Sequence, residues 1–248
     1  MTDGHTRAAA AVRAGLTSVP TVSERDDLNW DLYRTCVSEC LRRGVRSPSD
    51  LTGRILSRED YRLKWDRWCD LIREEPLRLE LRDEEWPYLG TDHDRVIVRA
   101  ILVDDRGFFH FVRADRDDDF GKAVLIETSG GGVEAGEDLR KAVLRELREE
   151  LGAEAEIVCE LGTVSDYYNL IFRHNINHYF LCRAVSFGKN DLTEDERDRF
   201  HLSPLCLSFE DAVREYETRA CTKLGRLIAN RELPVLRRAE EFVRCSIR

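Results

Sequence analysis

The stretch that decides the fold is GGVEAGEDLRKAVLRELREELGA, which runs from Gly131 to Ala153. We expect a helix from about Asp138 to Gly152, because apolar residues recur at helical spacing and a terminal glycine suits a left-handed C-cap. On a helical wheel, at ~100° per residue, the apolar residues cover an arc of about 140°. These residues are Leu139, Val143, Leu144, Leu147 and Leu151.

Three carboxylates, Glu146, Glu149 and Glu150, lie at the edge of this apolar arc rather than on the basic solvent face. Glu146 and Glu150 form an i,i+4 like-charge pair, which costs a few tenths of a kcal/mol. Glu149 and Glu150 also lie in the last turn, where the helix dipole disfavours anions. Arg145 can reach Glu149, but one arginine does not neutralise three acids, whereas a hard divalent cation would. A solvated acidic face, the simpler alternative, explains the glutamates poorly.

The same stretch resembles the Nudix box, written G-x5-E-x7-R-E-U-x-E-E-x-G-U, where U is a bulky aliphatic residue. The positions that match in register are Gly131, Glu137, Arg145, Glu146, Leu147, Glu149, Glu150 and Gly152. Ala153 at the last U position is a mild departure, and Ser129 and Gly130 stand where many members carry a proline before the glycines. A pattern with this many fixed positions is far more specific than a lone glycine motif.

The resemblance implies an α/β fold, the Nudix α/β/α sandwich with a mixed sheet. It also implies hydrolysis of a diphosphate linkage in a nucleoside diphosphate linked to another moiety. The implied cofactor is Mg²⁺, with Mn²⁺ as a substitute. The implied metal ligands are Glu146, Glu149, Glu150 and the backbone carbonyl of Gly131 or Gly132, with Glu137 and Arg145 orienting the glutamates. The general base stays open between Glu146 and an acid outside the box, Glu194 or Glu196.

The segment from Asp166 to His178 is the next most informative. Tyr167 or Tyr168 could stack on a base or ribose, and Arg173 and His174 could contact phosphate. Ordinary aromatic packing explains these residues equally well. Sequence extensions typical of Nudix enzymes for NADH or coenzyme A are not found, nor is the proline of some ADP-ribose enzymes. The tyrosines therefore favour a dinucleoside polyphosphate or a nucleoside triphosphate as the small-molecule partner.

Two other functions fit the same family fold. A Nudix-like ligand-sensing or interaction domain with weak catalysis would be expected to lose box glutamates, and all of them are present. An isomerase of the isopentenyl diphosphate type needs a catalytic cysteine in a loop. Cys159 and Cys182 fall in predicted strands instead. We therefore favour the metal-dependent hydrolase.

Composition limits the class of protein further. The 248 residues are 42% hydrophobic and 35% charged, with a net charge of -9, a pI near 5.3 and a mean hydropathy of -0.47. An acidic chain argues against nonspecific nucleic-acid binding, which relies on a basic surface. No long apolar run could span a membrane. Eight cysteines without a C-x-x-C motif indicate buried thiols in a reducing compartment, so we expect a cytoplasmic protein.

The order of patterns along the chain predicts four regions. Residues 1–24 are predicted to be a flexible tail, although the alanine run allows a short helix. Residues 25–90, which hold all four tryptophans, are predicted to be a helical extension whose aromatic stripe packs in a core or forms a partner surface, such as a homodimer contact. Residues 91–218 are predicted to be the Nudix domain, with Asp115–Asp119 as an acidic loop. Residues 219–248 are predicted to form two helical stretches on either side of Pro234.

Overall fold

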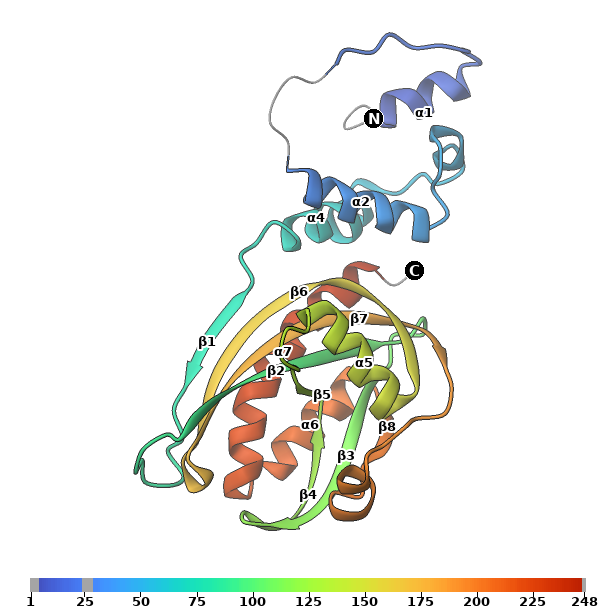
Figure 1. The fold of residues 1–248 in the computed structure, drawn as a ribbon. Helices are drawn as coiled ribbons and strands as arrows, with labels where there is room; N and C mark the ends of the chain where they lie inside the picture. Colours follow the sequence, from blue (N-terminus) through green and yellow to red (C-terminus); the bar gives the residue numbers. More distant parts are fainter. Residues whose placement is uncertain (1–4, 24–28, 247–248) are drawn as a thin grey trace. The chain divides into compact units, whose positions relative to one another are not determined.

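The computed structural model describes residues 5–23 and 29–246. The chain divides into two compact units, Met1–Glu74 and Glu75–Arg248, which we call the N-terminal and the C-terminal unit. Figure 1 draws both, and each is described by itself. The boundary falls before the predicted one at residue 90, so a short segment of the predicted extension belongs to the C-terminal unit.

The N-terminal unit is helical. Its elements are α1 (His5–Arg13), α2 (Trp30–Arg42), η1 (Pro48–Leu51), α3 (Arg58–Tyr61), the π-helical turn η2 (Arg62–Asp66) and α4 (Arg67–Leu71). The Asn29 side chain caps α2 by accepting from the N–H of Leu32, and Ser57 caps α3 in the same way. Trp68 is fully buried and stacks on Trp65. The alanine run lies in α1, so residues 5–13 of the predicted tail form a short helix. Residues 1–4 and 24–28 of the predicted tail and extension lie outside the described residues.

The C-terminal unit is built on one mixed sheet of eight strands. The strands are β1 (Leu77–Leu81), β2 (His93–Val103), β3 (Phe109–Asp118), β4 (Gly121–Glu127), β5 (Ser129–Gly132), β6 (Ala153–Tyr168), β7 (Arg173–Phe187) and β8 (Ser203–Leu207). Their order is β1-β6-β7-β2-β3-β4, with β5 paired to β2 and β8 paired to β3. The β1–β6 and β2–β7 pairs are parallel and the others antiparallel.

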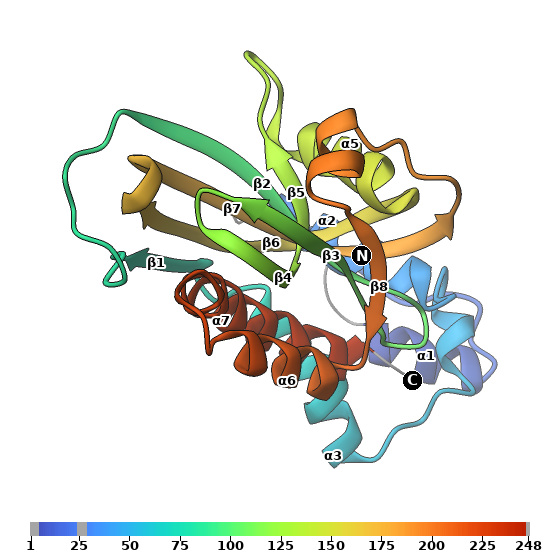
Figure 2. The same ribbon diagram turned by 90° about the horizontal axis from the view of Figure 1, so that it is seen from below.

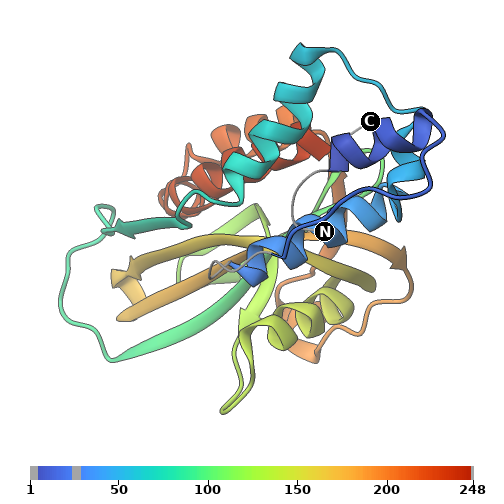
Figure 3. The same cartoon turned by 90° about the horizontal axis from the view of Figure 1, so that it is seen from above.

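Helices cover both faces of this sheet. Figures 2 and 3 show α5 (Leu139–Leu151) on one side and α6 (Phe209–Arg219) with α7 (Lys223–Ser246) on the other. Alternate residues of β2 divide between the faces, as strand geometry requires. Val98, Ala100 and Leu102 pack in one core with α5, whereas Arg99 points to the α7 side, where it bonds to Asn177 and lies near Glu232. The α/β sandwich with a mixed sheet is therefore confirmed.

Three predictions about elements were wrong. Residues 77–81 form a strand that pairs with β6, and not part of a helical extension. Residues 115–118 continue β3 because they pair with β4, so the acidic loop is shorter than predicted. The two C-terminal helical stretches are one helix, α7, which runs through Pro234. Both halves of α7 bury apolar residues, including Leu224, Ile228, Val235 and Leu236, and this packing outweighs the hydrogen bond lost at proline.

Candidate functional site

The box helix α5 is fixed at both ends by the residues that the sequence indicated. The Asp138 side chain accepts hydrogen bonds from the N–H groups of Arg140 and Lys141. Gly152 ends the helix with φ 62°, in the left-handed region. A Cβ on Gly152 would lie 2.4 Å from the carbonyl oxygen of Gly188, so only glycine fits there. The predicted helix from about Asp138 to Gly152 is confirmed.

The glycines of β5 bring the backbone against the glutamates of α5. A Cβ added to Gly131 would lie 2.6 Å from Oε1 of Glu146, so a side chain at this position would displace the carboxylate. Gly130 has φ 154°, and its N–H donates to Oε2 of Glu150 at 2.8 Å. The strand itself is held by antiparallel pairing with β2, with Gly131 opposite Val98. The glycines therefore allow the backbone of β5 to lie close to the carboxylates of α5.

Arg145 is the centre of the polar contacts. Its guanidinium binds both oxygens of Glu137 at 3.0 Å, a bidentate arrangement. The Nη1 atom also donates to Glu146 at 2.8 Å and to Glu149 at 2.9 Å, and Nη2 donates to the carbonyl of Gly132 at 3.2 Å. Arg145 thus connects Gly132 and Glu137, near the start of the box, with two of the three box glutamates.

Burial changes the acidity of the two inner glutamates. Glu150 is 5% exposed, and burial raises the pKa of its carboxyl to about 8, although the Gly130 N–H partly offsets this. Burial also raises the pKa of Glu146, against the opposing effect of Arg145. The charge of Glu196, which precedes β8, further raises both pKa values. Glu196 therefore lies in the electrostatic environment of the box.

The substrate-contacting residues proposed from the sequence lie on two faces of the sheet. Tyr167 stacks on His174, with ring centroids 4.4 Å apart, and His174 contacts Ser165 and Asp94. Tyr168 points to the opposite face, where its hydroxyl accepts from Arg231 of α7 and Arg173 lies over its ring. The four residues therefore form two pairs and not one surface.

Comparison with known proteins decides the family. The model of the family described as the NUDIX domain matches residues 93–220, which include strands β2 to β8, the box helix and α6. The chain belongs to the NUDIX family. As a member it is a hydrolase that acts on phosphoanhydride bonds, as the box predicted. Among proteins with curated descriptions, none matches the sequence of this NUDIX chain.

Several solved structures resemble this NUDIX hydrolase at low identity. A NUDIX hydrolase from Nitrosomonas europaea is 19% identical, with TM-score 0.42, and the match covers 50% of this chain and 78% of that one. The E. coli ORF135 protein is 24% identical, with TM-score 0.37, over 51% and 80% of the two chains. A MutT NUDIX hydrolase from Burkholderia pseudomallei is 24% identical, with TM-score 0.38, over 48% and 86%. Similarities this low say nothing about the substrate.

The NUDIX box offers donors that suit a hard cation. Three carboxylates and the backbone of Gly131 converge at the same side of α5 and β5, and oxygen donors of this kind are those that Mg²⁺ prefers. In the described residues, the three carboxylates do not all come within 4.8 Å of one another. Arg145 bridges Glu146 and Glu149. The donor set therefore fits the cation in its chemistry.

Sequence reasoning missed Arg95 as a residue of the NUDIX site. Its guanidinium lies 3.2 Å from the position a Cβ on Gly132 would take, beside the box loop. The charge of Glu146 partly offsets the lowering of the Arg95 pKa, which arises first from burial and then from Arg99. Arg95 in turn helps lower the pKa of Arg173, after burial. A single arginine at the start of a strand carries no pattern, so only the fold could reveal this pair.

The cysteines depart from the prediction of buried thiols. All eight lie in the described part of the chain and none forms a disulfide; Cys182 and Cys245 are buried, whereas Cys206 and Cys221 are exposed.

Within residues 5–23 and 29–246, no helix has the length and apolar character needed to cross a lipid bilayer.

Proposed function

We propose that this NUDIX hydrolase cleaves a diphosphate linkage in a nucleoside diphosphate linked to another moiety, with a divalent cation as cofactor. The observation that carries the proposal is the close approach of the Gly131 backbone to Glu146, beside the buried Glu150 and the Arg145-bound Glu149. Arg145 contacts only Glu146 and Glu149 of the three glutamates, so a cation can supply the positive charge that the box lacks.

In this proposal Glu146, Glu149, Glu150 and the carbonyl of Gly131 hold Mg²⁺, for which Mn²⁺ can substitute. The bound ion would offset the charge on the phosphates and increase the acidity of a bound water. Arg145 and Glu137 keep the glutamates in place through their bidentate contact. Two acids remain candidates for the base that accepts the proton of the attacking water. They are Glu146 and Glu196, whose charge raises the pKa values of Glu146 and Glu150.

Arg95 and Arg173 supply the positive charge for the substrate. Arg173 Nε is buried without a hydrogen-bond partner in the described residues, and a buried donor without a partner is costly. The pair lies where β2 and β7 run side by side, with His93 opposite Arg173. A phosphate group of the substrate would give both guanidinium groups a partner. The stacked Tyr167 and His174 are the candidate surface for a base or ribose.

The experiment is a screen of nucleotide substrates with and without Mg²⁺. The panel contains dinucleoside polyphosphates, nucleoside triphosphates, ADP-ribose, NADH and coenzyme A, and released nucleoside monophosphate and phosphate are measured. Glu150→Gln should slow turnover of the best substrate by orders of magnitude, because it removes one ligand charge without changing shape. The matched control is Glu154→Gln, whose side chain is exposed and paired with Arg148, and it should retain activity.

Two results would overturn the proposal. One is wild-type activity that survives EDTA, and the other is a Glu150→Gln enzyme that turns over at the wild-type rate. If the protein binds members of the panel without cleaving any, the alternative of a ligand-sensing domain replaces it. The proposal also places the enzyme in the cytoplasm, where nucleotides are abundant and thiols stay reduced.

A further inference from the structure

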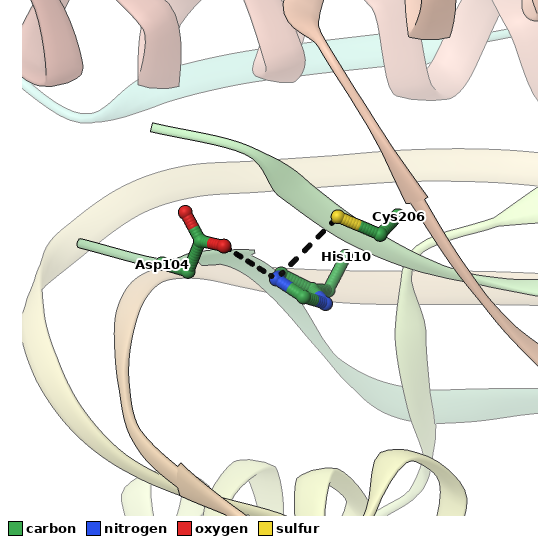
Figure 4. Close-up of side chains that lie close together, drawn as sticks. All are labelled: Asp104, His110 and Cys206. Carbon is green, nitrogen blue, oxygen red and sulfur yellow. Dashed lines mark hydrogen bonds and ion pairs between the residues drawn. The ribbon is translucent and has the colours of Figure 1, made fainter. Parts of the chain in front are cut away.

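A second group of metal-binding side chains lies away from the box, at the turn between β2 and β3. Asp104, His110 and Cys206 each offer one donor atom, and these three atoms all lie within 4.8 Å of one another. Figure 4 shows the His110 ring between the Asp104 carboxylate and the Cys206 sulfur. Asp104 follows β2, His110 lies on β3, and Cys206 stands directly opposite His110 on the neighbouring strand β8.

The spacing of these donors matches a tetrahedral transition-metal site. His110 Nε2 lies 3.4 Å from Asp104 Oδ2 and 3.9 Å from Cys206 Sγ. Zinc bond lengths with tetrahedral angles put neighbouring oxygen and nitrogen ligands ~3.4 Å apart and nitrogen and sulfur ligands ~3.6 Å apart. Small side-chain rotations therefore suffice to bind an ion, and no strand has to move.

Two of the three donor residues, Asp104 and His110, are held by their surroundings. Asp104 Oδ1 accepts from the N–H groups of Arg106 and Phe108, at 2.9 Å each, which fixes the turn and leaves Oδ2 directed at His110. The His110 ring packs on Phe187, with centroids 4.6 Å apart. Turn capping explains the Oδ1 contacts of Asp104. It does not explain why an imidazole nitrogen lies 3.4 Å from the other oxygen, with a thiol 3.9 Å from that same nitrogen.

We propose that Asp104, His110 and Cys206 form a binding site for a thiophilic divalent cation of the Zn²⁺ class, with water as the fourth ligand. Imidazole and thiolate are the donors that zinc prefers, whereas Mg²⁺ takes oxygen ligands. The Arg106 guanidinium donates to Asp104 Oδ2 at 3.0 Å and competes for it. Its side chain is 70% exposed, so it can move into solvent when an ion binds.

The proposed site is separate from the box in both position and chemistry. Its donors come from the β2–β3 turn and β8, while the box glutamates come from α5. Because the box has no thiol or imidazole, a spectroscopic signal of a metal–thiolate bond reports on Cys206 and not on Glu146 or Glu150. The ion would link β8 to the turn, a role that is independent of the hydrolytic reaction.

Co²⁺ is the probe for this site, since it replaces Zn²⁺ and shows a near-ultraviolet charge-transfer band when a thiolate binds. The full chain is titrated with Co²⁺ in a large excess of Mg²⁺, which occupies the box glutamates. We expect the band to appear, to saturate with one bound ion per chain and to disappear when Zn²⁺ is added. Cys206→Ser should abolish the band, and His110→Asn should weaken Co²⁺ binding by tenfold or more.

The matched control is Cys221→Ser, which removes another exposed thiol outside the group and should leave the band unchanged. Arg106→Gln removes the competing cation and should tighten Co²⁺ binding. Circular dichroism verifies that each variant is folded, and the wild-type titration stands without any variant. Absence of the band from the wild type, or its survival in folded Cys206→Ser, would overturn the proposal. Neither result affects the proposed hydrolase, which rests on the box glutamates.

Discussion

At the scale of single residues, Glu150 shows how much the fold changes an ordinary carboxyl group. Its position in the last turn of α5 and its burial both disfavour the charged form. The pKa of about 8 means that, without a cation, the folded chain keeps a proton on Glu150 at neutral pH. The unfolded chain releases that proton near the ordinary glutamate pKa, so folding and protonation are coupled.

This coupling predicts the pH dependence of stability in EDTA. Between the ordinary pKa and about pH 8 the folded state binds more protons than the unfolded state, so stability should fall as pH rises. The melting temperature, followed by circular dichroism, should therefore decrease from about pH 5 to about pH 9. In Glu150→Gln the decrease should be shallower, with the remainder due to Glu146, whose pKa is also raised. An equally steep decrease in the variant would contradict this origin.

The second prediction at this scale concerns the kinetic role of Arg95 and Arg173. Substituting either by alanine should lower kcat/KM for the best substrate by roughly ten- to a hundredfold, the range expected for losing one hydrogen bond to a charged group. Stability should not fall, because each removal also relieves repulsion between the two guanidinium groups. Arg113→Ala, on the exposed side of β3, is the control. Unchanged kinetics in both variants would show that neither Arg95 nor Arg173 contributes to substrate binding.

At the residue scale, the sequence predicted the residues of one local element but not the contacts between residues far apart in the chain. Fixed spacing within one helix placed Glu146, Glu149 and Glu150 correctly along α5, and the capping roles of Asp138 and Gly152 are local. The pairing of Arg95 with Arg173 depends on two strands distant in sequence. The sequence offers Tyr167 and Tyr168 for the same stacking role, but adjacent strand residues point to opposite faces of a sheet.

At the scale of elements, α7 shows tertiary packing outweighing a local signal. Pro234 predicts an interruption, but the helix is continuous because its face is buried against the sheet. That face also carries a buried ionic group. Arg231 donates to Glu232 at 2.9 Å, to the Tyr168 hydroxyl at 2.8 Å and to Asp166 at 3.3 Å. Periodicity in the sequence does not predict such a group, since Arg231 and Glu232 come from α7 and their partners Asp166 and Tyr168 from β6.

Removing Arg231 should therefore be costly. Arg231→Met fills similar space but leaves Asp166 without this cation, while Glu232 and Glu127 keep Arg99. Breaking a buried ion pair costs about 3–5 kcal/mol. Urea unfolding followed by fluorescence measures the loss. Arg244→Met is the control, because the Arg244 side chain that pairs with Glu240 is 69% exposed, and an exposed arginine in an ion pair contributes at most about 1 kcal/mol. Equal losses in the two variants would show that the buried group does not stabilise α7.

At the scale of the whole molecule, the compact C-terminal unit is larger than the family match. The match begins at residue 93, yet the unit begins at Glu75. The segment between them contains β1, whose alternation of leucine with charged residues at 77–81 is itself a strand pattern. The tryptophans and the nearby helices obscured that pattern and led to a predicted boundary at residue 90.

The contacts of this segment are specific. β1 pairs with β6 from Leu77 to Leu81. Asp83 accepts from the backbone N–H of Asn169 at 2.7 Å, and the Asn169 side chain donates back to the carbonyls of Asp83 and Trp86. Glu85 forms a bidentate ion pair with Arg226 of α7. The segment thus covers the edge of β6 and connects the sheet to α7.

Two truncated chains test whether this segment belongs to the folded domain. A chain of residues 75–248 retains every one of these contacts, whereas a chain of residues 91–248 loses them all and exposes the edge of β6. We expect the shorter chain to have the lower melting temperature and to aggregate more, because an unpaired strand edge and newly exposed apolar surface promote association. Thermal unfolding and light scattering at equal concentration measure both effects. Equal melting temperature and solubility of the two chains would instead place the domain boundary at residue 90, where the sequence alone put it.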